Sequence, residues 1–120
     1  MIEASERQRG HIAEACDAIT AALVGVDLDG YKRNRLVRSS VEREFIIIGE
    51  AISALSHAAP EIFAGITRAR RIVDFRNQLT HEYPTVDDSV VWAIADRDVH
   101  VLRHECSALM QGIEGERQTE

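Results

Sequence analysis

The chain has 120 residues, enough for one domain, and 45% of them are hydrophobic, as is ordinary for a globular protein. Its formal net charge of −6 argues against indiscriminate binding of nucleic acid, because that binding depends on neutralising phosphates. No signal peptide opens the chain and no apolar run reaches the ~18 residues of a membrane span, so we expect a cytoplasmic protein with no membrane partner.

Helices are the predicted elements throughout, because Ala, Leu, Ile, Glu and Arg are plentiful and only two prolines interrupt the chain. Residues 6–24 carry one apolar stripe at three- and four-residue steps. Residues 26–34 break that pattern and predict a loop or a short polar helix. Cys16 and Cys106 lie among apolar residues in no metal or redox spacing, so we expect buried, reduced thiols.

The clearest predicted helix spans about residues 39–59, with Ser39 or Ser40 capping its start. Its apolar stripe consists of Val41, Phe45, Ile48, Ile52 and Leu55. Pro60 ends this helix and suits the first turn of another. Glu50 interrupts the apolar run, and its carboxylate needs a partner if it turns inward but none if it faces water.

Two more helices are predicted in the second half of the chain. Residues 68–79 carry an apolar face made by Ile72, Phe75 and Leu79. A last helix begins after Pro84, where Thr85 and Asp88 resemble a capping box.

The sum of these elements is an all-α fold. We predict one domain over residues 1–120, an up-and-down bundle of four to five helices, with its core in about residues 6–110. Residues 111–120 lose the apolar pattern, and we expect them to fray.

Two groups of polar side chains have an ordinary explanation beside a functional one. His100 and His104 stand four apart on the last helix but lack a third ligand, so we predict ordinary surface or interface histidines and no metal site. The cationic run from Lys32 to Arg38 is typical of a solvated face, and it can also face an anionic ligand.

The stretch RNQLTHEYP, residues 76–84, gathers polar side chains where a helix should close. Arginine binds phosphate through two hydrogen bonds and histidine exchanges protons near neutral pH, so Arg76 and His81 suit RNA cleavage by a neighbouring 2′-hydroxyl. Five residues along a straight helix turn through ~140° net and rise ~7.5 Å, so these two side chains do not share a face. They meet one ligand only if the helix ends near residue 80 or if a second subunit of a symmetric dimer supplies one of them. The plainer interpretation is an Arg76 ion pair and a His81 helix cap.

The R-x4-H-x-Y pattern of Arg76, His81 and Tyr83 resembles the motif of the HepT-like toxins of the HEPN superfamily, which pair with MntA-type nucleotidyltransferase antitoxins. The segment VEREFIIIGEA (residues 41–51) resembles the glutamate-bearing second helix of that family. The segment FRNQLTHEYPTVDDSVVW (residues 75–92) resembles its motif block and the entry into the next helix.

The resemblance implies a homodimeric endoribonuclease that needs no metal and no other cofactor, the toxin of a type VII toxin–antitoxin system. Arg76 and His81 would be catalytic, with Asn77 in support. Glu50 would also support the site, and the motif does not choose between it and Glu42 or Glu44. The cognate nucleotidyltransferase would AMPylate Tyr83 with ATP as AMP donor, and the added negative charge would repel the RNA substrate. Transfer RNA is one class of RNA to expect as substrate. The alternative is a non-catalytic partner that binds nucleotide or substrate for a small nucleotidyltransferase.

Overall fold

A computed structural model describes residues 2–81 and 86–119, with side chains at residues 4–81 and 86–108. Over this range the chain is helical and has no strand, so the prediction of an all-α bundle is confirmed. The helices are α1 (Ile2–Ala22), α2 (Leu28–Arg33), α3 (Arg35–Ala58), α4 (Pro60–Ala64), α5 (Ala69–His81) and α6 (Asp88–Thr119). None of the described helices has an apolar stretch long enough to cross a membrane.

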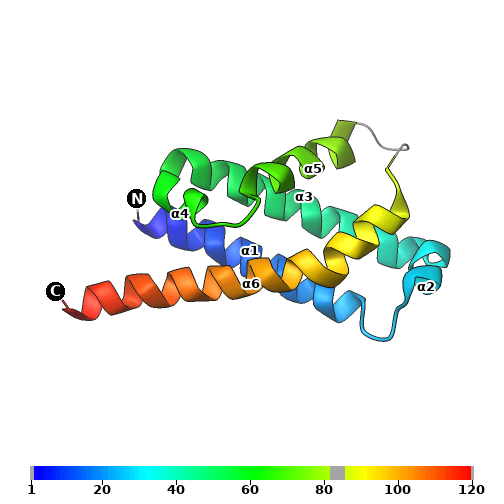
Figure 1. Cartoon of the computed structure of the whole chain (residues 1–120), viewed down its shortest axis with the longest axis horizontal. Coiled ribbons are helices and arrows are strands. Elements are labelled where there is room, and N and C mark those ends of the chain that lie inside the picture. The colour runs from blue at the N-terminus through cyan, green and yellow to red at the C-terminus, as the bar shows by residue number, and fades with distance from the viewer. Residues whose placement is uncertain (1, 82–85, 120) are drawn as a thin grey trace.

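Three long helices form the body of the molecule, which measures 52 × 29 × 19 Å (Figure 1). Helix α1 packs against both α3 and α6, and α5 packs along α3. The end of α5 and the start of α6 lie toward the end of the molecule where α2 turns the chain, and both termini lie toward the opposite end (Figure 1). This arrangement brings the end of the predicted motif helix and the cationic run to the same end of the bundle.

The core lies where the long helices meet. All five residues of the predicted α3 stripe are buried, which confirms the periodicity over Val41–Leu55. Each side chain of this size contributes about 1.5–3 kcal/mol on full burial. Cys16 and Cys106 are buried free thiols, and burial raises the pKa of Cys106 to about 11. These two thiols are therefore protonated at neutral pH.

The start of α3 differs from the prediction, because Asn34 caps the helix before Ser39 or Ser40 can. The Asn34 side-chain oxygen accepts a hydrogen bond from the Val37 amide at 3.2 Å, so the helix begins at Arg35. Asparagine is among the best N-cap residues.

The last helix also begins later than predicted. The Asp87 carboxylate accepts a hydrogen bond from the Ser89 amide at 2.8 Å, so Asp87 takes the capping place predicted for Thr85. Thr85 itself lies outside the described residues. Helix α6 extends to Thr119, and the fraying of residues 111–120 stays a prediction.

The segment 26–34 forms the short helix α2, one of the two predicted alternatives. Asp27 caps its start by accepting a hydrogen bond from the Gly30 amide at 2.7 Å. Tyr31 is fully buried, although the segment is polar, and its hydroxyl has no hydrogen-bond partner. Burial is the main cause that raises the pKa of Tyr31. The ring therefore anchors α2 to the bundle through apolar contact alone.

We predict that Tyr31→Phe raises the free energy of unfolding by up to about 1 kcal/mol, because it removes a buried hydroxyl that has no partner. Tyr31→Ala should lower it by about 3–5 kcal/mol, because it leaves a cavity. Chemical denaturation of the three proteins measures both changes. A loss of more than 1 kcal/mol in Tyr31→Phe would show that the hydroxyl makes a stabilising contact.

Candidate active site

Helix α5 carries the motif and is held on α3 by an aromatic contact. The rings of Phe45 and Phe75 meet edge to face, with centroids 5.2 Å apart and an interplanar angle of 76°. Such pairs contribute about 0.5–1.5 kcal/mol beyond their buried area. Because Phe75 sets the rotation of α5, the next residue, Arg76, has a fixed direction relative to α3.

Arg76 rests on Gly49 of α3. A Cβ atom placed on Gly49 would lie 2.6 Å from Cγ of Arg76 and closer still to its Cβ. Carbon atoms in contact are normally ~3.5–4.0 Å apart, so only glycine permits this approach of the two helices. The sequence showed Gly49 within the segment VEREFIIIGEA, but no residue pattern indicated that it supports Arg76.

The Arg76 guanidinium is half-buried and has unused donors. Its Nε is buried without a hydrogen-bond partner, and Arg76 forms no ion pair within the described part of the chain. A buried donor without a partner costs about 1–3 kcal/mol. The plainer interpretation of an Arg76 ion pair is therefore not met among the described residues. A cation in a fixed place with free donors is suited to a phosphate.

The other predicted site residues are more exposed. His81 is the last residue of α5, and its side chain and that of Asn77 are exposed. Glu50 follows Gly49 on α3, but it faces water and makes no hydrogen bond with Arg76. Tyr83 lies outside the described residues.

The motif keeps helical geometry up to its histidine. The Thr80 hydroxyl donates hydrogen bonds to the carbonyl oxygens of Arg76 and Asn77, each at 3.1 Å, and α5 ends only at His81. Within one subunit, the side chains of Arg76 and His81 are therefore separated by a net rotation of ~140° about the axis of α5. Because α5 ends at His81, close to the predicted limit near residue 80, both ways in which the two side chains could meet one ligand remain compatible with the structure.

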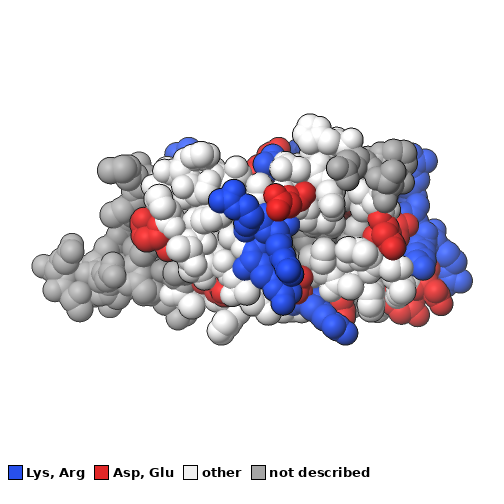
Figure 2. All heavy atoms as spheres, turned by 45° about the horizontal axis from the view of Figure 1, so that its top comes forward, with Lys and Arg blue, Asp and Glu red and all other residues white. Residues whose placement is uncertain are grey.

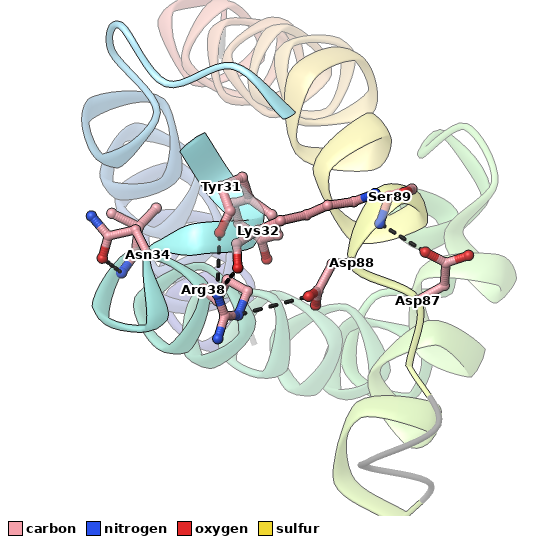
Figure 3. Close-up of polar contacts among 8 residues, drawn as sticks. Tyr31, Lys32, Asn34, Arg38, Asp87, Asp88 and Ser89 are labelled. Atoms are coloured by element: carbon pink, nitrogen blue, oxygen red, sulfur yellow. Dashed lines mark hydrogen bonds and ion pairs between the residues drawn. The ribbon is translucent and has the colours of Figure 1, made fainter. Parts of the chain in front are cut away.

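After the motif, the chain re-enters the bundle at a charged cluster between α2, α3 and the start of α6 (Figure 3). Arg38 Nε lies 3.7 Å from the Asp88 carboxylate, and Arg38 Nη1 donates to the carbonyl oxygens of Tyr31 and Lys32. Burial and then Asp88 raise the pKa of Glu42, whereas Arg38 lowers it. The cluster ties the first residue of α6 to the start of α3 and the end of α2.

Comparison with protein-family models supplies the deciding observation. The model described as "Ribonuclease HepT-like" matches residues 12–109, which is most of the chain. The chain belongs to the ribonuclease HepT-like family. The predicted resemblance and the enzyme class, a ribonuclease, are confirmed at the level of the family, and the match includes Gly49, Arg76 and His81.

Curated relatives of this HepT-like chain carry matching descriptions. It is 28% identical over 94 residues to "Putative RNase MJ1380" of Methanocaldococcus jannaschii, covering 78% of this chain and 85% of that protein. It is 22% identical over 101 residues to "Putative RNase TTE0752" of Caldanaerobacter subterraneus subsp. tengcongensis, covering 84% and 89%. It is 25% identical over 104 residues to "Putative RNase MJ1216" of M. jannaschii, covering 87% and 85%. No solved structure matches the chain significantly.

A cavity of about 400 Å³ lies between α3, α5 and α6 of the HepT-like chain. Its walls are mostly apolar, with Arg68 and Arg71 from the α5 side and Asp98 and Glu105 from α6. The Glu105 carboxylate also accepts hydrogen bonds from the amide and hydroxyl of Thr67, which ties the turn before α5 to α6. Arg76 does not line this cavity, so the cavity and the motif are separate features of α5.

Metal-binding groups are absent from the described residues, where no three His, Cys, Asp or Glu side chains converge as ligands would. His100 and His104 are exposed, so the prediction of surface histidines is confirmed.

We predict that Gly49→Ala displaces Arg76 and weakens the HepT-like chain in two ways. The added methyl group meets the stem of Arg76 rather than its flexible end, so α5 must shift. This shift should lower the free energy of unfolding by about 1–3 kcal/mol, and the better helix propensity of alanine should offset ~1 kcal/mol of that loss. A shift of about 1 Å at a catalytic group can cost ~100-fold in rate. Denaturation and RNA cleavage assays measure the two effects.

Gly10→Ala is the matched control for this prediction, because a Cβ atom at Gly10 in α1 has no atom within 4 Å. It should raise the free energy of unfolding by up to ~1 kcal/mol and leave cleavage unchanged. If Gly49→Ala behaved like Gly10→Ala in both assays, the close approach at Arg76 would have no functional role.

Proposed function

We propose that this HepT-like chain is the toxin of a type VII toxin–antitoxin system, a homodimeric endoribonuclease that cleaves RNA without a metal. The observation that carries the proposal is the half-buried Arg76, which rests on Gly49 and has no acidic partner among the described residues. Such an arginine is available to a phosphate that enters from outside the subunit. Membership of the ribonuclease HepT-like family supports RNA as the source of that phosphate.

The proposed reaction is an attack by the 2′-hydroxyl on the adjacent phosphodiester. One His81 takes the proton of the 2′-hydroxyl, the 2′-oxygen bonds to phosphorus, and the bond to the 5′-oxygen breaks. A second His81 gives a proton to the departing 5′-oxygen, while Arg76 stabilises the charge on the phosphoryl oxygens. The products are a 2′,3′-cyclic phosphate and a 5′-hydroxyl, and each histidine can return to its first state by exchange with water.

The proposed homodimer supplies the second histidine. A two-fold axis beside the ends of the two α5 helices would place two copies of Arg76 and His81 around one groove. The separation of these residues on one helix supports this arrangement, because one subunit presents them on different faces. Asn77 is exposed near the same end of α5 and would hold the RNA backbone, and Glu50 would act only if a partner subunit covers it.

The proposed off-switch is AMPylation of Tyr83 by a cognate MntA-type nucleotidyltransferase that uses ATP. Tyr83 follows His81 by two residues, so an AMP group on it would lie close to the groove. The group brings a phosphodiester charge, which would repel the RNA phosphates.

A second function, a nucleotide-binding module without catalysis, is favoured by the cavity between α3, α5 and α6. Its volume of about 400 Å³ lies within the range of small-molecule sites, and Arg68 and Arg71 could bind a phosphate at its edge. If AMP bound there, Arg71→Ala should weaken that binding, and Arg76→Ala should not. Catalytic inactivity of the wild-type dimer together with such binding would favour this function over the ribonuclease.

We predict that His81→Ala lowers the rate of RNA cleavage by about 10²–10⁴-fold, because general acid and base catalysis is lost. Arg76→Lys should also be strongly impaired, because it keeps the charge but loses two-bond binding of phosphate. Cleavage should continue in EDTA and yield 2′,3′-cyclic phosphate ends. The measurement is gel analysis of RNA products, with growth arrest on expression as the cellular counterpart.

Gln78→Ala is the control, because Gln78 is exposed on the same helix between the two motif residues. It should cleave RNA like the wild type, and so it separates a general effect on α5 from loss of the catalytic groups. Equal activity in His81→Ala, Gln78→Ala and wild type would refute the catalytic assignment.

We predict that incubation with ATP and the cognate nucleotidyltransferase adds one or more AMP units to Tyr83 and stops RNA cleavage. Intact-mass spectrometry measures the addition, and Tyr83→Phe should show none. The only other tyrosine, Tyr31, is fully buried and serves as an internal control. Addition of AMP to Tyr83→Phe, or no addition to the wild type, would contradict the proposed switch.

A further inference from the structure

The cations of this acidic chain differ in whether they are already paired. Arg38 is paired with Asp88, and Arg103 with Asp17. By contrast Lys32, Arg33 and Arg35 are exposed, and none forms an ion pair within the described part of the chain. We call these three residues the α2–α3 corner.

The α2–α3 corner is a rigid platform. Asp27 caps α2 through the Gly30 amide at 2.7 Å before the corner, and Asn34, which lies between Arg33 and Arg35, caps α3 through the Val37 amide at 3.2 Å. The buried ring of Tyr31 fixes α2 to the bundle. Ligands bound on preorganised side chains lose less entropy than ligands bound on a flexible loop.

Arg38 leaves the corner free to bind an external anion. The carbonyl oxygens at the end of α2 would attract the nearby cations, but Arg38 Nη1 already donates to those of Tyr31 and Lys32 (Figure 3). The Asp88 carboxylate is in turn occupied by Arg38. Asp88 is therefore engaged inside the cluster, whereas Lys32, Arg33 and Arg35 are exposed to solvent.

The other cationic group, Arg68, Arg70 and Arg71, is partly engaged. Arg68 and Arg71 line the cavity that Asp98 and Glu105 also line. The Arg70 guanidinium lies 5.9 Å from the centre of the Phe63 ring. Figure 2 shows one band of cations across the middle of the molecule and another group at the end where α2 lies, with acidic side chains beside both.

The chain between α5 and α6 limits how far the corner can lie from the proposed groove. Asp88 is the seventh residue after His81, so their Cα atoms are at most ~25 Å apart, and Asp88 contacts Arg38 at 3.7 Å. The end of α5 and α2 lie toward the same end of the molecule (Figure 1). Leu36, 84% exposed, adds aliphatic surface beside the cations for contact with a base or ribose.

We propose that the α2–α3 corner binds the phosphates of the RNA strand beside the cleaved bond, an inference that rests on the proposed ribonuclease function. A chain with a net charge of −6 repels RNA over most of its surface, so substrate must dock where cations are unpaired. Lys32, Arg33 and Arg35 provide this local attraction, while Arg76 and His81 act on the scissile phosphate.

The test measures binding of a single-stranded RNA oligonucleotide to the inert His81→Ala protein by fluorescence anisotropy over a range of salt concentrations. The triple change Lys32→Ala, Arg33→Ala, Arg35→Ala in that background should reduce the steepness of log K against log salt by about 2. Each phosphate contact on a single strand contributes ~0.7 to this slope, and three contacts are lost. This corresponds to binding about 100-fold weaker at 0.1 M salt. All three residues are exposed, and circular dichroism confirms that the variant is folded.

The matched control changes Arg68, Arg70 and Arg71 to alanine, which removes the same net charge and should change the slope by less than 1. The inference is overturned if this control loses as much RNA binding as the corner variant, or if the corner variant binds RNA like its parent. Loss of binding to an acidic protein partner with unchanged RNA binding would also overturn it, in favour of a protein-docking surface. If the parent protein bound no RNA and the wild type cleaved none, the ribonuclease function itself would fail, together with this inference.

Discussion

The contact between Arg76 and Gly49 is the constraint on which the site depends. It brings α5 so close to α3 that the stem of Arg76 occupies the space that a side chain at position 49 would need. The edge-to-face contact of Phe75 with Phe45 fixes the rotation of α5. The guanidinium is consequently held half-buried, with a buried Nε that no described residue satisfies. In the proposed function, a bound phosphate would offset part of the cost of that unsatisfied donor, which would link the packing of two helices to the binding of phosphate. Because α5 stays helical to His81, the same rigidity keeps the histidine on another face.

Charge pairing, rather than net charge, distinguishes the surfaces of this protein. Arg38 and Arg103 form ion pairs with Asp88 and Asp17. Arg68 and Arg71 line the cavity together with Asp98 and Glu105. Arg76 and the α2–α3 corner are not committed in this way among the described residues. An acidic protein with a cluster of exposed, unpaired cations at one end binds a polyanion more strongly there than elsewhere. Such a distribution suits an enzyme that should act on selected RNA and be silenced by one added negative group.

The sequence predicted the helices well where buried residues repeat with the helical period. It predicted the helix starts less well, because a single capping hydrogen bond decides where each helix begins. Val41, Phe45, Ile48, Ile52 and Leu55 are buried because their spacing leaves no other face for them. The starts of α3 and α6 were misplaced because several residues could cap, and only the fold selects Asn34 and Asp87. Tyr31 was missed as a core residue because its neighbours are polar. The roles of Arg76 and His81 came from resemblance, whereas the support from Gly49 arises where two distant segments meet and cannot be read from either alone.

The central claim is that one groove uses catalytic residues of both subunits. The direct measurement is the rate of RNA cleavage by dimers assembled from wild-type and His81→Ala chains in varied proportion, at constant total protein and after complete subunit exchange. If base and acid come from the two copies of His81, only wild-type pairs are active and the rate falls with the square of the wild-type fraction, to about a quarter at an equal mixture. A linear fall, to about a half at an equal mixture, would mean that each subunit cleaves alone and would contradict the account.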